Sequence, residues 1–397
     1  MTEPCLFHMK TKRIVLSAGC LALLMQGMAM GAEVSTPPAS EVERLQLDSF
    51  YEKYLSYQGF PIVASSEVSD YALKEAAFLI GQMLEGREDV IAALVAGKVR
   101  LSIMSIGEFT TDVPEHATLE PKIYWDKRAR GLGASKERPA VSVGEENLLG
   151  YPGDPYAAES IMIHEFAHAI HLMGLVEVDS TFQQKLEQTF NRAGIAGLWK
   201  GKYAGTNPSE YWAEGVQSWF DTNRENDFEH NHVNTREELK EHDPGLAALV
   251  ASVFGDGDWR YQKPLLRSEA PHLTGYTAEN AQTFVWPRNL VKAYEALERG
   301  DDRELWELQS MDTYESKNVT VKSGPTINIR FENKSNQRLA VYWVGFDGIR
   351  REYAKLDPGR NHEQGTYGAH LWVVVDEKGQ DLGWLRAGGV NGRVIMK

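Results

Sequence analysis

The residues with the clearest chemical potential lie in the stretch IMIHEFAHAIHLMG, residues 161–174. His164 and His168 are four positions apart, so on a helix they project from one face and two imidazole nitrogens can meet one metal ion. Glu165 is rotated by about 100° from them, which lets its carboxylate reach a metal-bound water without ligating the metal. The pattern indicates a zinc site with a general base. The alternative is a core helix whose histidines hydrogen-bond inside the protein.

This helix is expected to begin at Asp154 as N-cap with Pro155 in its first position, and to run to about Met173, with Gly174 as its stop. One class of zinc peptidase places a glycine three residues after the second histidine and a third histidine six residues after it, whereas position 171 is histidine in this chain. Here position 174 is glycine, so that order is not met. We therefore predict a structural or supporting role for His171.

A third ligand would then be a glutamate on a later helix. Glu177 is too close because the chain must turn first, which leaves Glu187 and Glu210. The segment Asn207-Pro208 predicts a helix start, with Glu210 in its first turn and Glu214 one turn later on the same face. A simpler interpretation is that Glu210 only completes a capping box with Asn207.

The stretch YAGTNPSEYWAE, residues 203–214, together with HEFAH resembles the anthrax lethal factor catalytic-domain family, zinc endopeptidases of the gluzincin class. The resemblance is clearest over residues 150–225 and looser over 40–310. It implies that Glu210 is the third ligand of one Zn²⁺ per chain and that Tyr203 assists catalysis. Glu214 would lie near the site and could orient a zinc-bound histidine. In this mechanism Glu165 takes the proton of a zinc-activated water, and Tyr203 donates to the oxyanion.

The elements that would position these residues suggest an α+β fold with a zincin-like, mainly helical peptidase domain. We expect helices from Val42 through Leu55, over residues 71–86 and over 87–98, with Ser69 and Asp70 capping the second. Strands are expected over 99–107, 122–125 and 140–146. An edge strand in such a domain can hold an extended substrate by backbone pairing.

Residues 313–397 change character. The segments TINIRFEN, RLAVYWVGF and AHLWVVVD alternate like strands and are separated by turn residues, which predicts a small all-β sandwich. Residues 317–397 carry 13 Lys and Arg against 8 Asp and Glu, whereas the whole chain has a net charge of −14. This asymmetry indicates a peptidase domain over 33–312 and a separately built domain over 313–397. The acidic main body argues against nucleic-acid binding.

The C-terminal stretch from Phe331 to Asp376 resembles the β domain of the von Hippel–Lindau tumour suppressor family, without a gap from Trp343 to Trp372. That family binds 4-hydroxyproline in an extended peptide. The resemblance implies a peptide-binding pocket formed by Trp343, Tyr353, Thr366, His370 and Trp372, with Tyr367 beside it. Thr366 stands where the family has serine, so a hydroxyl is kept. The alternative is that these aromatic side chains are core residues.

The N-terminus is expected to be a signal peptide over residues 1–32, because the basic Lys10, Lys12 and Arg13 precede an apolar run and small residues. An uncleaved anchor, or a lipid anchor at Cys20, remains an alternative. Both cysteines, Cys5 and Cys20, lie in this segment, so the mature chain would have none. The family's ubiquitin-ligase-recruiting domain has no counterpart before Lys397, so no such partner is expected.

Together these features predict a secreted or periplasmic zinc metalloendopeptidase with a C-terminal domain that binds peptide or protein ligands, hydroxyproline-containing ones as the sharper expectation. The competing hypothesis is a catalytically silent binding or adhesion protein that keeps a metal-stabilised fold. Metal-dependent hydrolysis of a non-protein amide is a third alternative.

Overall fold

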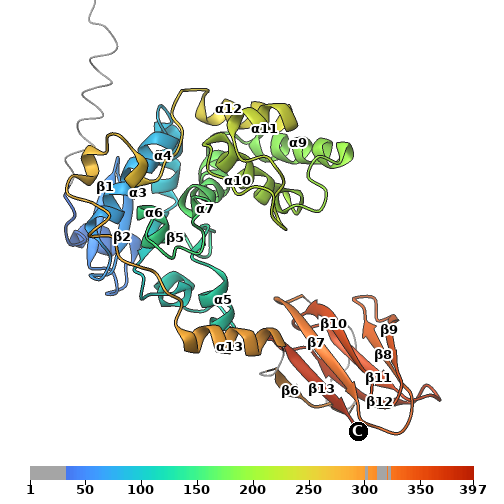
Figure 1. The fold of residues 1–397 in the computed structure, drawn as a ribbon. Coiled ribbons are helices and arrows are strands. Elements are labelled where there is room, and N and C mark those ends of the chain that lie inside the picture. The colour runs from blue at the N-terminus through green and yellow to red at the C-terminus, as the bar shows by residue number, and fades with distance from the viewer. Residues whose placement is uncertain (1–32, 300–302, 311–319, 321–322) are drawn as a thin grey trace, which may run out of the picture. The chain divides into compact units, whose positions relative to one another are not determined.

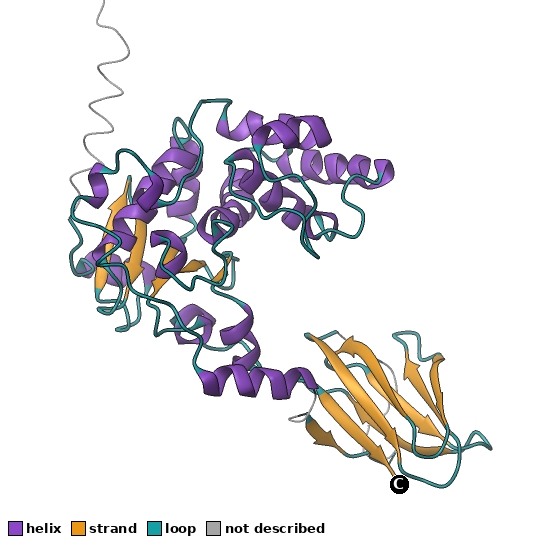
Figure 2. Ribbon diagram, in the orientation of Figure 1, coloured by secondary structure: helices purple, strands orange, loops and turns teal. Residues whose placement is uncertain are grey.

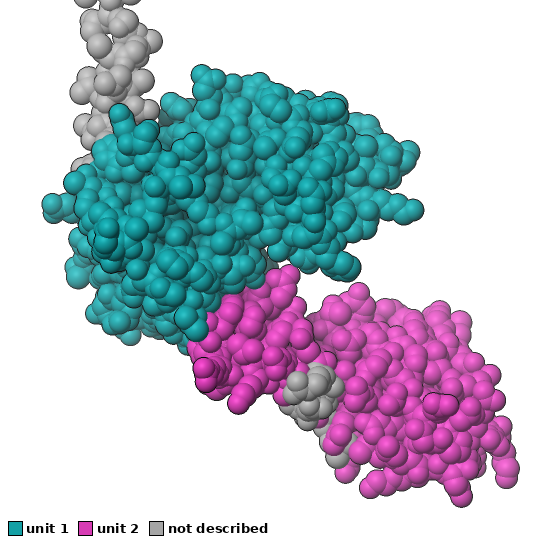
Figure 3. Space-filling view, in the orientation of Figure 1, with its two compact units in different colours: residues 1–117, 130–285 teal, residues 118–129, 286–397 magenta. Residues whose placement is uncertain are grey.

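The computed structural model describes residues 33–299, 303–310, 320 and 323–397. The chain divides into two compact units, one formed by residues 1–117 and 130–285 and the other by residues 118–129 and 286–397 (Figure 3). The first unit mixes helices with one sheet, and the second ends in an all-β region (Figure 2). The expected mixed fold with a C-terminal β region is confirmed at this level. The predicted signal segment 1–32 lies outside the described residues.

The first unit is built around one five-stranded sheet, of which Figure 1 labels β1, β2 and β5, and its strand order is β1-β2-β3-β5-β4. β1 and β2 form an antiparallel hairpin through Gln58 and Gly59, which both have positive φ, as a tight two-residue turn requires. β2, β3 and β5 run parallel, and β4 closes the sheet as an antiparallel edge. The strands are β1 (Lys53–Tyr57), β2 (Phe60–Ala64), β3 (Arg100–Met104), β4 (Gly131–Leu132) and β5 (Ala140–Gly144).

Helices surround this sheet and share one apolar core with it. α7 is central, because it packs on β5 and β4 on one side and on α10 on the other. The helices of this unit are α2 (Ala39–Leu45), α3 (Asp70–Met83), α4 (Glu88–Ala96), α6 (Glu145–Leu149), α7 (Ile161–Ala169), α8 (Val176–Val178), α9 (Phe182–Ala196), α10 (Pro208–Trp219), α11 (Arg236–His242) and α12 (Pro244–Phe254).

The histidine-bearing helix begins later and ends later than the sequence suggests. Asp154 accepts the backbone N–H of Tyr156 in a turn, and the true N-cap is Ser160, whose Oγ accepts from Ile163 N at 3.3 Å. After α7 the helix continues as the π-helix Ile170–Leu175 and then as α8. Gly174 does not stop it. A Cβ there would lie 2.8 Å from Val90 Cγ1, so the glycine allows α4 to pack closely.

This continuous helical stretch, Ile161–Val178, is long and apolar enough to cross a membrane by length and composition alone. However, 72% of it is buried inside the protein. A helix that is apolar on most sides and enclosed in this way is a core helix of its unit.

Two other segments differ from expectation. Residues 122–125 were predicted as a strand but form the start of α5 (Lys122–Arg128), because four residues are too few to separate a period of 2 from one of 3.6. The expected helix through Leu55 ends at Leu45, and Lys53–Tyr57 forms β1. In contrast, the predicted cap at Ser69, the helices α3 and α4, and the strands β3 and β5 are confirmed.

The second unit contains α5, α13 (Arg288–Arg299) and a β-sandwich. α5 packs on α13, with the Tyr124 and Tyr294 rings stacked at 6.2 Å. The two sheets have the orders β10-β7-β13-β6 and β12-β11-β8-β9. The strands are β6 (Glu304–Trp306), β7 (Thr326–Asn333), β8 (Leu339–Val344), β9 (Arg350–Leu356), β10 (Asn361–Tyr367), β11 (Leu371–Val375), β12 (Asp381–Arg386) and β13 (Gly392–Met396).

The division between the units therefore differs from the expected ranges 33–312 and 313–397. The step in charge near residue 317 falls inside the sandwich unit, since β6 already belongs to one of its sheets through parallel pairing with β13. Residues 286–299 join that unit because α13 packs on α5. Such helix-to-helix contacts leave no mark in the local composition.

Candidate functional site

The two histidines of the HEFAH motif meet on one face of α7. His164 and His168 are 7% and 9% exposed, and their Nε2 atoms lie 3.2 Å apart. This is the geometry that the spacing of four residues predicts. Both imidazoles therefore present the same ring nitrogen to one point.

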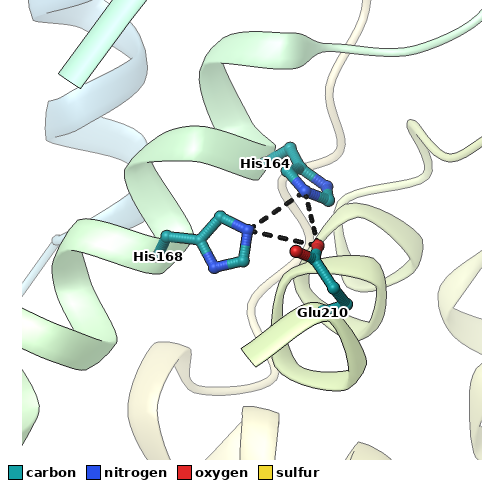
Figure 4. Close-up of side chains that lie close together, drawn as sticks. All are labelled: His164, His168 and Glu210. Carbon is teal, nitrogen blue, oxygen red and sulfur yellow. Dashed lines mark hydrogen bonds and ion pairs between the residues drawn. The ribbon is translucent and has the colours of Figure 1, made fainter. Parts of the chain in front are cut away.

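α10 brings Glu210 to that point (Figure 4). Its Oε2 lies 3.2 Å from His164 Nε2 and 3.3 Å from His168 Nε2. Asn207 caps α10 by accepting the N–H groups of Ser209 and Glu210, but the Glu210 side chain turns to the histidines instead of back to the cap. The capping-box interpretation of Glu210 is therefore wrong. One ligand atom from each of the three residues lies within 4.8 Å of the others.

The other candidate ligands lie elsewhere. Glu187 accepts a hydrogen bond from Gln183 Nε2 at 2.7 Å on the exposed side of α9. His171 is fully buried, and its Nε2 lies 2.7 Å from Gln183 Oε1. The donor set that converges in the described part of the chain is two imidazole nitrogens and one carboxylate, which is one of the donor sets that can hold a catalytic Zn²⁺ with a further coordination position left open.

The electrostatics of the group also suit a cation. Burial alone would lower the pKa of His164, but the Glu210 hydrogen bond and the charges of Glu165 and Glu214 raise it to about 10. Burial would likewise raise the pKa of Glu210, but its hydrogen bonds with His164 and His168 hold that pKa well below its usual value. A cation at this point would replace the protons that these groups otherwise attract.

The Nδ1 atom of His164, the ring nitrogen that does not face Glu210, contacts a residue that the sequence did not single out. His164 Nδ1 lies 2.8 Å from Gln217 Oε1, while Glu214 Oε1 is 3.7 Å away. Glu214 was expected to orient a ligand histidine, but the residue in direct contact with His164 Nδ1 is Gln217. Gln217 is itself held by its Nε2, which donates to Glu159 Oε2 at 3.0 Å. Residues 210, 214 and 217 are spaced i, i+4 and i+7, so helical periodicity could have found it.

Glu214 instead links the group to a buried loop. It is 3% exposed, accepts from Asn223 Nδ2 at 2.9 Å and lies 3.3 Å from His230 Nε2. His230 Nδ1 in turn lies 2.9 Å from Asp227 Oδ1. Burial favours neutral forms, yet the contact with Glu214 raises the pKa of His230. His230 was not predicted from the sequence.

Tyr203 lies beside the same group. It begins the short 3-10 turn η4 (Tyr203–Gly205), and its backbone N–H donates to Glu229 O at 2.8 Å. Its ring stacks at 6.3 Å on the His164 ring and lies 6.4 Å from the His230 ring. The structure therefore brings the predicted auxiliary tyrosine next to the predicted ligands.

Glu165 faces the edge strand β4. A Cβ added to Gly133, just past that strand, would lie 2.8 Å from His168 Cβ and 3.4 Å from Glu165 Oε2. A Cβ on Gly131 would lie 2.4 Å from Ile161 Cγ2 and 3.1 Å from Glu165 Cγ. Only glycine lets this edge approach the helix so closely. The half-buried Glu165 is thus held between the ligand histidines and a strand edge.

In the second unit, the predicted pocket residues gather around His370. The Trp343 ring stacks on the His370 ring with their centroids 5.2 Å apart. The ring of the half-exposed Tyr353 lies nearly at right angles to the Trp343 ring, with the centroids 6.5 Å apart. The Thr366 hydroxyl lies 3.2 Å from His370 Nδ1, and the Ser323 hydroxyl lies 2.9 Å from Nε2. Burial lowers the pKa of His370, so the ring is favoured neutral.

Trp372 behaves as a core residue more than as a pocket wall. It is 1% exposed and packs against Phe331 in the core of the sandwich, although its ring also meets Tyr353 at 5.2 Å. Two residues that the sequence did not indicate complete the surroundings. Thr320 accepts from Trp343 Nε1 at 3.1 Å, and the exposed Phe346 lies 5.9 Å from His370. Tyr367, 46% exposed, flanks the ring at 5.3 Å.

Comparison with known protein families gives one finding for this second unit. Residues 319–385 match the VHL beta domain. None of the curated proteins matches the chain. The VHL beta domain is a protein-substrate-binding module, so the match supports a ligand-binding role for the C-terminal β region. The matched residues lie wholly within the second unit, so the match does not bear on the first unit.

Proposed function

We propose that the first unit is a zinc-dependent endopeptidase of the lethal-factor type. The observation that carries this proposal is the convergence of His164, His168 and Glu210 from two helices, with Glu165 and Tyr203 beside them. A core helix with internally satisfied histidines would need no carboxylate between both Nε2 atoms. The surplus of carboxylates around His164 also favours a cation over a purely structural cluster.

Each residue of the group has a defined task in peptide hydrolysis. Zn²⁺, when held by His164, His168 and Glu210, would supply an acidified water and polarise the scissile carbonyl. Glu165 accepts the proton of that water and returns it to the leaving amine. Tyr203 donates a hydrogen bond to the oxyanion that develops on the substrate. Gln217 holds His164 in one orientation from behind.

The edge strand supplies the place for the peptide. Among the described strands β4 pairs with β5 alone, so its other backbone edge can pair with an extended chain. The glycines at 131 and 133 keep that edge within reach of Glu165. A peptide paired there would pass directly in front of the ligand group, which favours an endopeptidase over hydrolysis of small amides.

Metal analysis and cleavage assays on the full chain test this function. We expect about one zinc per chain, hydrolysis of a mixed peptide library, and no hydrolysis by Glu165→Gln with its zinc retained. Glu187→Gln, which removes an exposed carboxylate, is the matched control and should keep full activity. Zinc without any cleavage by the wild type would instead support the silent binding protein.

We also propose that the β domain binds hydroxyproline-containing peptides. The aromatic rings of Trp343 and Tyr353 suit a pyrrolidine ring, and Thr366 and His370 place a hydroxyl and a neutral imidazole together for its hydroxyl group. Calorimetry with paired proline and 4-hydroxyproline peptides tests this. Equal affinity for the two peptides would contradict it.

Export of the protein is part of the same proposal. Residues 33–397 contain no cysteine, so the folded chain needs no control of its redox state outside the cytoplasm. N-terminal sequencing of the protein recovered from the periplasm or medium tests it. Recovery only of uncleaved chain from the cytoplasm would contradict it.

A further inference from the structure

Tyr203 lies on a stretch of chain that has little rigidity of its own. The segment 194–205 contains Gly194, Gly197, Gly201 and Gly205, and two of them have positive φ. Glycine allows more backbone conformations than other residues, so a segment rich in it does not fix a side chain by local structure alone. The turn η4 itself spans only three residues. The position of the Tyr203 side chain therefore depends on contacts with other parts of the chain.

The loop of residues 223–233 supplies such contacts. The carbonyl oxygen of Glu229 accepts the backbone N–H of Tyr203 at 2.8 Å. The carbonyl oxygen of Asp227 accepts a hydrogen bond from Lys202 Nζ at 3.0 Å. Two consecutive residues at the start of η4 are thus bonded to the same loop, so a movement of the loop would move the tyrosine.

The loop has a defined shape because several bonds close it. Asn226 N donates to the carbonyl oxygen of Asn231 at 2.7 Å, which joins its two arms. The Oδ1 atom of the exposed Asp227 accepts the backbone N–H groups of Glu229 and His230, each at 2.8 Å. A side chain that caps its own loop in this way restricts the backbone. The loop can therefore serve as a support for η4.

His230 connects this loop both to α10 and to the tyrosine. It is 5% exposed, with Nδ1 2.9 Å from Asp227 Oδ1 and Nε2 3.3 Å from Glu214 Oε2. A carboxylate only accepts hydrogen bonds, so two such partners require both ring nitrogens to donate and favour the imidazolium. Glu214 lies one helical turn after the proposed ligand Glu210. The ring of Tyr203 lies 6.4 Å from that of His230.

The same tyrosine ring also stacks on the ring of the proposed ligand His164, with the planes 28° apart. A hydrogen-bond donor stabilises an oxyanion best when it is already in place before the reaction. We propose that His230 is a positioning residue for Tyr203: it fastens loop 223–233 to α10 and so keeps the tyrosine hydroxyl where the substrate oxyanion develops. The assignment rests on the proposed peptidase function and deepens it, because it names a residue on which oxyanion stabilisation depends.

Paired substitutions test this assignment. His230→Gln should lower kcat about 10-fold and change KM and zinc affinity less than about 2-fold, because the tyrosine is displaced while the ligands stay. In a Tyr203→Phe background the same substitution should cost less than about 2-fold, since the hydroxyl that it positions is already gone. His232→Gln, exposed on the same loop, is the matched control and should leave kcat unchanged. A full loss in both backgrounds, or an equal loss of zinc affinity, would overturn the assignment.

A spectroscopic measurement tests the positioning apart from catalysis. In protein labelled with fluorotyrosine, the fluorine resonance of Tyr203 is identified by its loss in Tyr203→Phe. In His230→Gln this resonance should move toward that of the free amino acid, and in His232→Gln it should stay in place. A resonance that does not move in His230→Gln would overturn the assignment and leave the peptidase intact. Absence of any cleavage by the zinc-loaded wild type would overturn the peptidase and the assignment with it.

A second variant protects the test if His230→Gln fails to fold, which loss of its thermal unfolding transition would reveal. Asp227→Ala removes one partner of His230 from an exposed position. It should lower kcat about 3-fold when Tyr203 is present and have no effect in the Tyr203→Phe background. Unchanged kcat together with an unmoved Tyr203 resonance would overturn the assignment.

Discussion

Two buried histidines, His164 in the first unit and His370 in the second, show how differently the two sites are prepared for a ligand. Both are 7% exposed. Carboxylates surround His164 and raise its pKa to about 10, whereas the described side chains that contact the His370 ring carry hydroxyl or aromatic groups, and burial lowers its pKa. The first site concentrates negative charge, which would favour binding of a cation. The second keeps a neutral imidazole, which suits an uncharged hydroxyl-bearing ligand.

The largest expected effect is a loss of catalysis at the first site, with no change at the second. Glu165→Gln should lower kcat about 10²–10⁴-fold, because the amide cannot accept the water proton, while zinc content stays the same. Peptide binding by the β domain should not change. Steady-state kinetics, metal analysis and calorimetry on one preparation measure all three. A variant that kept wild-type kcat would remove Glu165 from the mechanism.

Removal of the metal should lower the unfolding temperature of the first unit but not that of the second. Zinc at 100 times its Kd stabilises a binding unit by about 2.7 kcal/mol, so chelation should lower the unfolding temperature of the first unit. The transition of the β-sandwich should stay in place, since its pocket depends on no cation. Scanning calorimetry with and without chelator shows this. Equal shifts of both transitions would mean that the units do not unfold separately.

The orienting contact behind His164 sharpens the comparison further. Gln217→Ala should weaken zinc binding about 10–100-fold, because His164 Nδ1 loses its partner. Gln183→Ala removes the corresponding partner of His171, which is not one of the proposed ligands, and should leave zinc affinity unchanged. Competition with a zinc indicator measures both. Equal losses in the two variants would point to general destabilisation.

The smallest expected effect lies in the β domain. Thr366→Ala should weaken binding of a hydroxyproline peptide by about 1 kcal/mol, the net contribution of one hydrogen bond, without affecting a proline peptide. Thr366→Ser should retain binding, because it keeps the hydroxyl. Thr326→Ala, an exposed threonine on the paired strand, serves as the control. Loss of affinity for both peptides alike would exclude a specific contact with the ligand hydroxyl.

Local signals in the sequence predicted part of this structure. The spacing of His164 and His168 and the caps at Ser69 and Asn207 depend only on neighbours within a turn or two, and these predictions agree with the structure. Residues 122–125 form a helix because that segment packs on α13, more than 160 residues away in sequence, and the sequence pattern carries no trace of this.

The site itself shows the same limit. Glu210 was chosen over Glu187 through the family resemblance of residues 203–214, yet the helical face that it shares with Glu214 also holds Gln217, whose importance appears only once His164 lies against it. The close approach of Gly131 and Gly133 to α7 is likewise a matter of tertiary packing, since nothing nearby in sequence demands glycine there. Residues whose roles depend on two elements meeting were therefore the ones missed.

The placement of Glu210, Glu214 and Gln217 on a single helix has a practical consequence. A shift or rotation of α10 against α7 would move all three residues at once. It would remove Glu210 as a proposed ligand, the contact of Glu214 with His230 and the contact of Gln217 with His164. Partial loosening of the two helices would then leave no half-formed centre that still retains metal. The zinc stoichiometry of a purified sample would thus count the fraction of molecules in which α7 and α10 are docked.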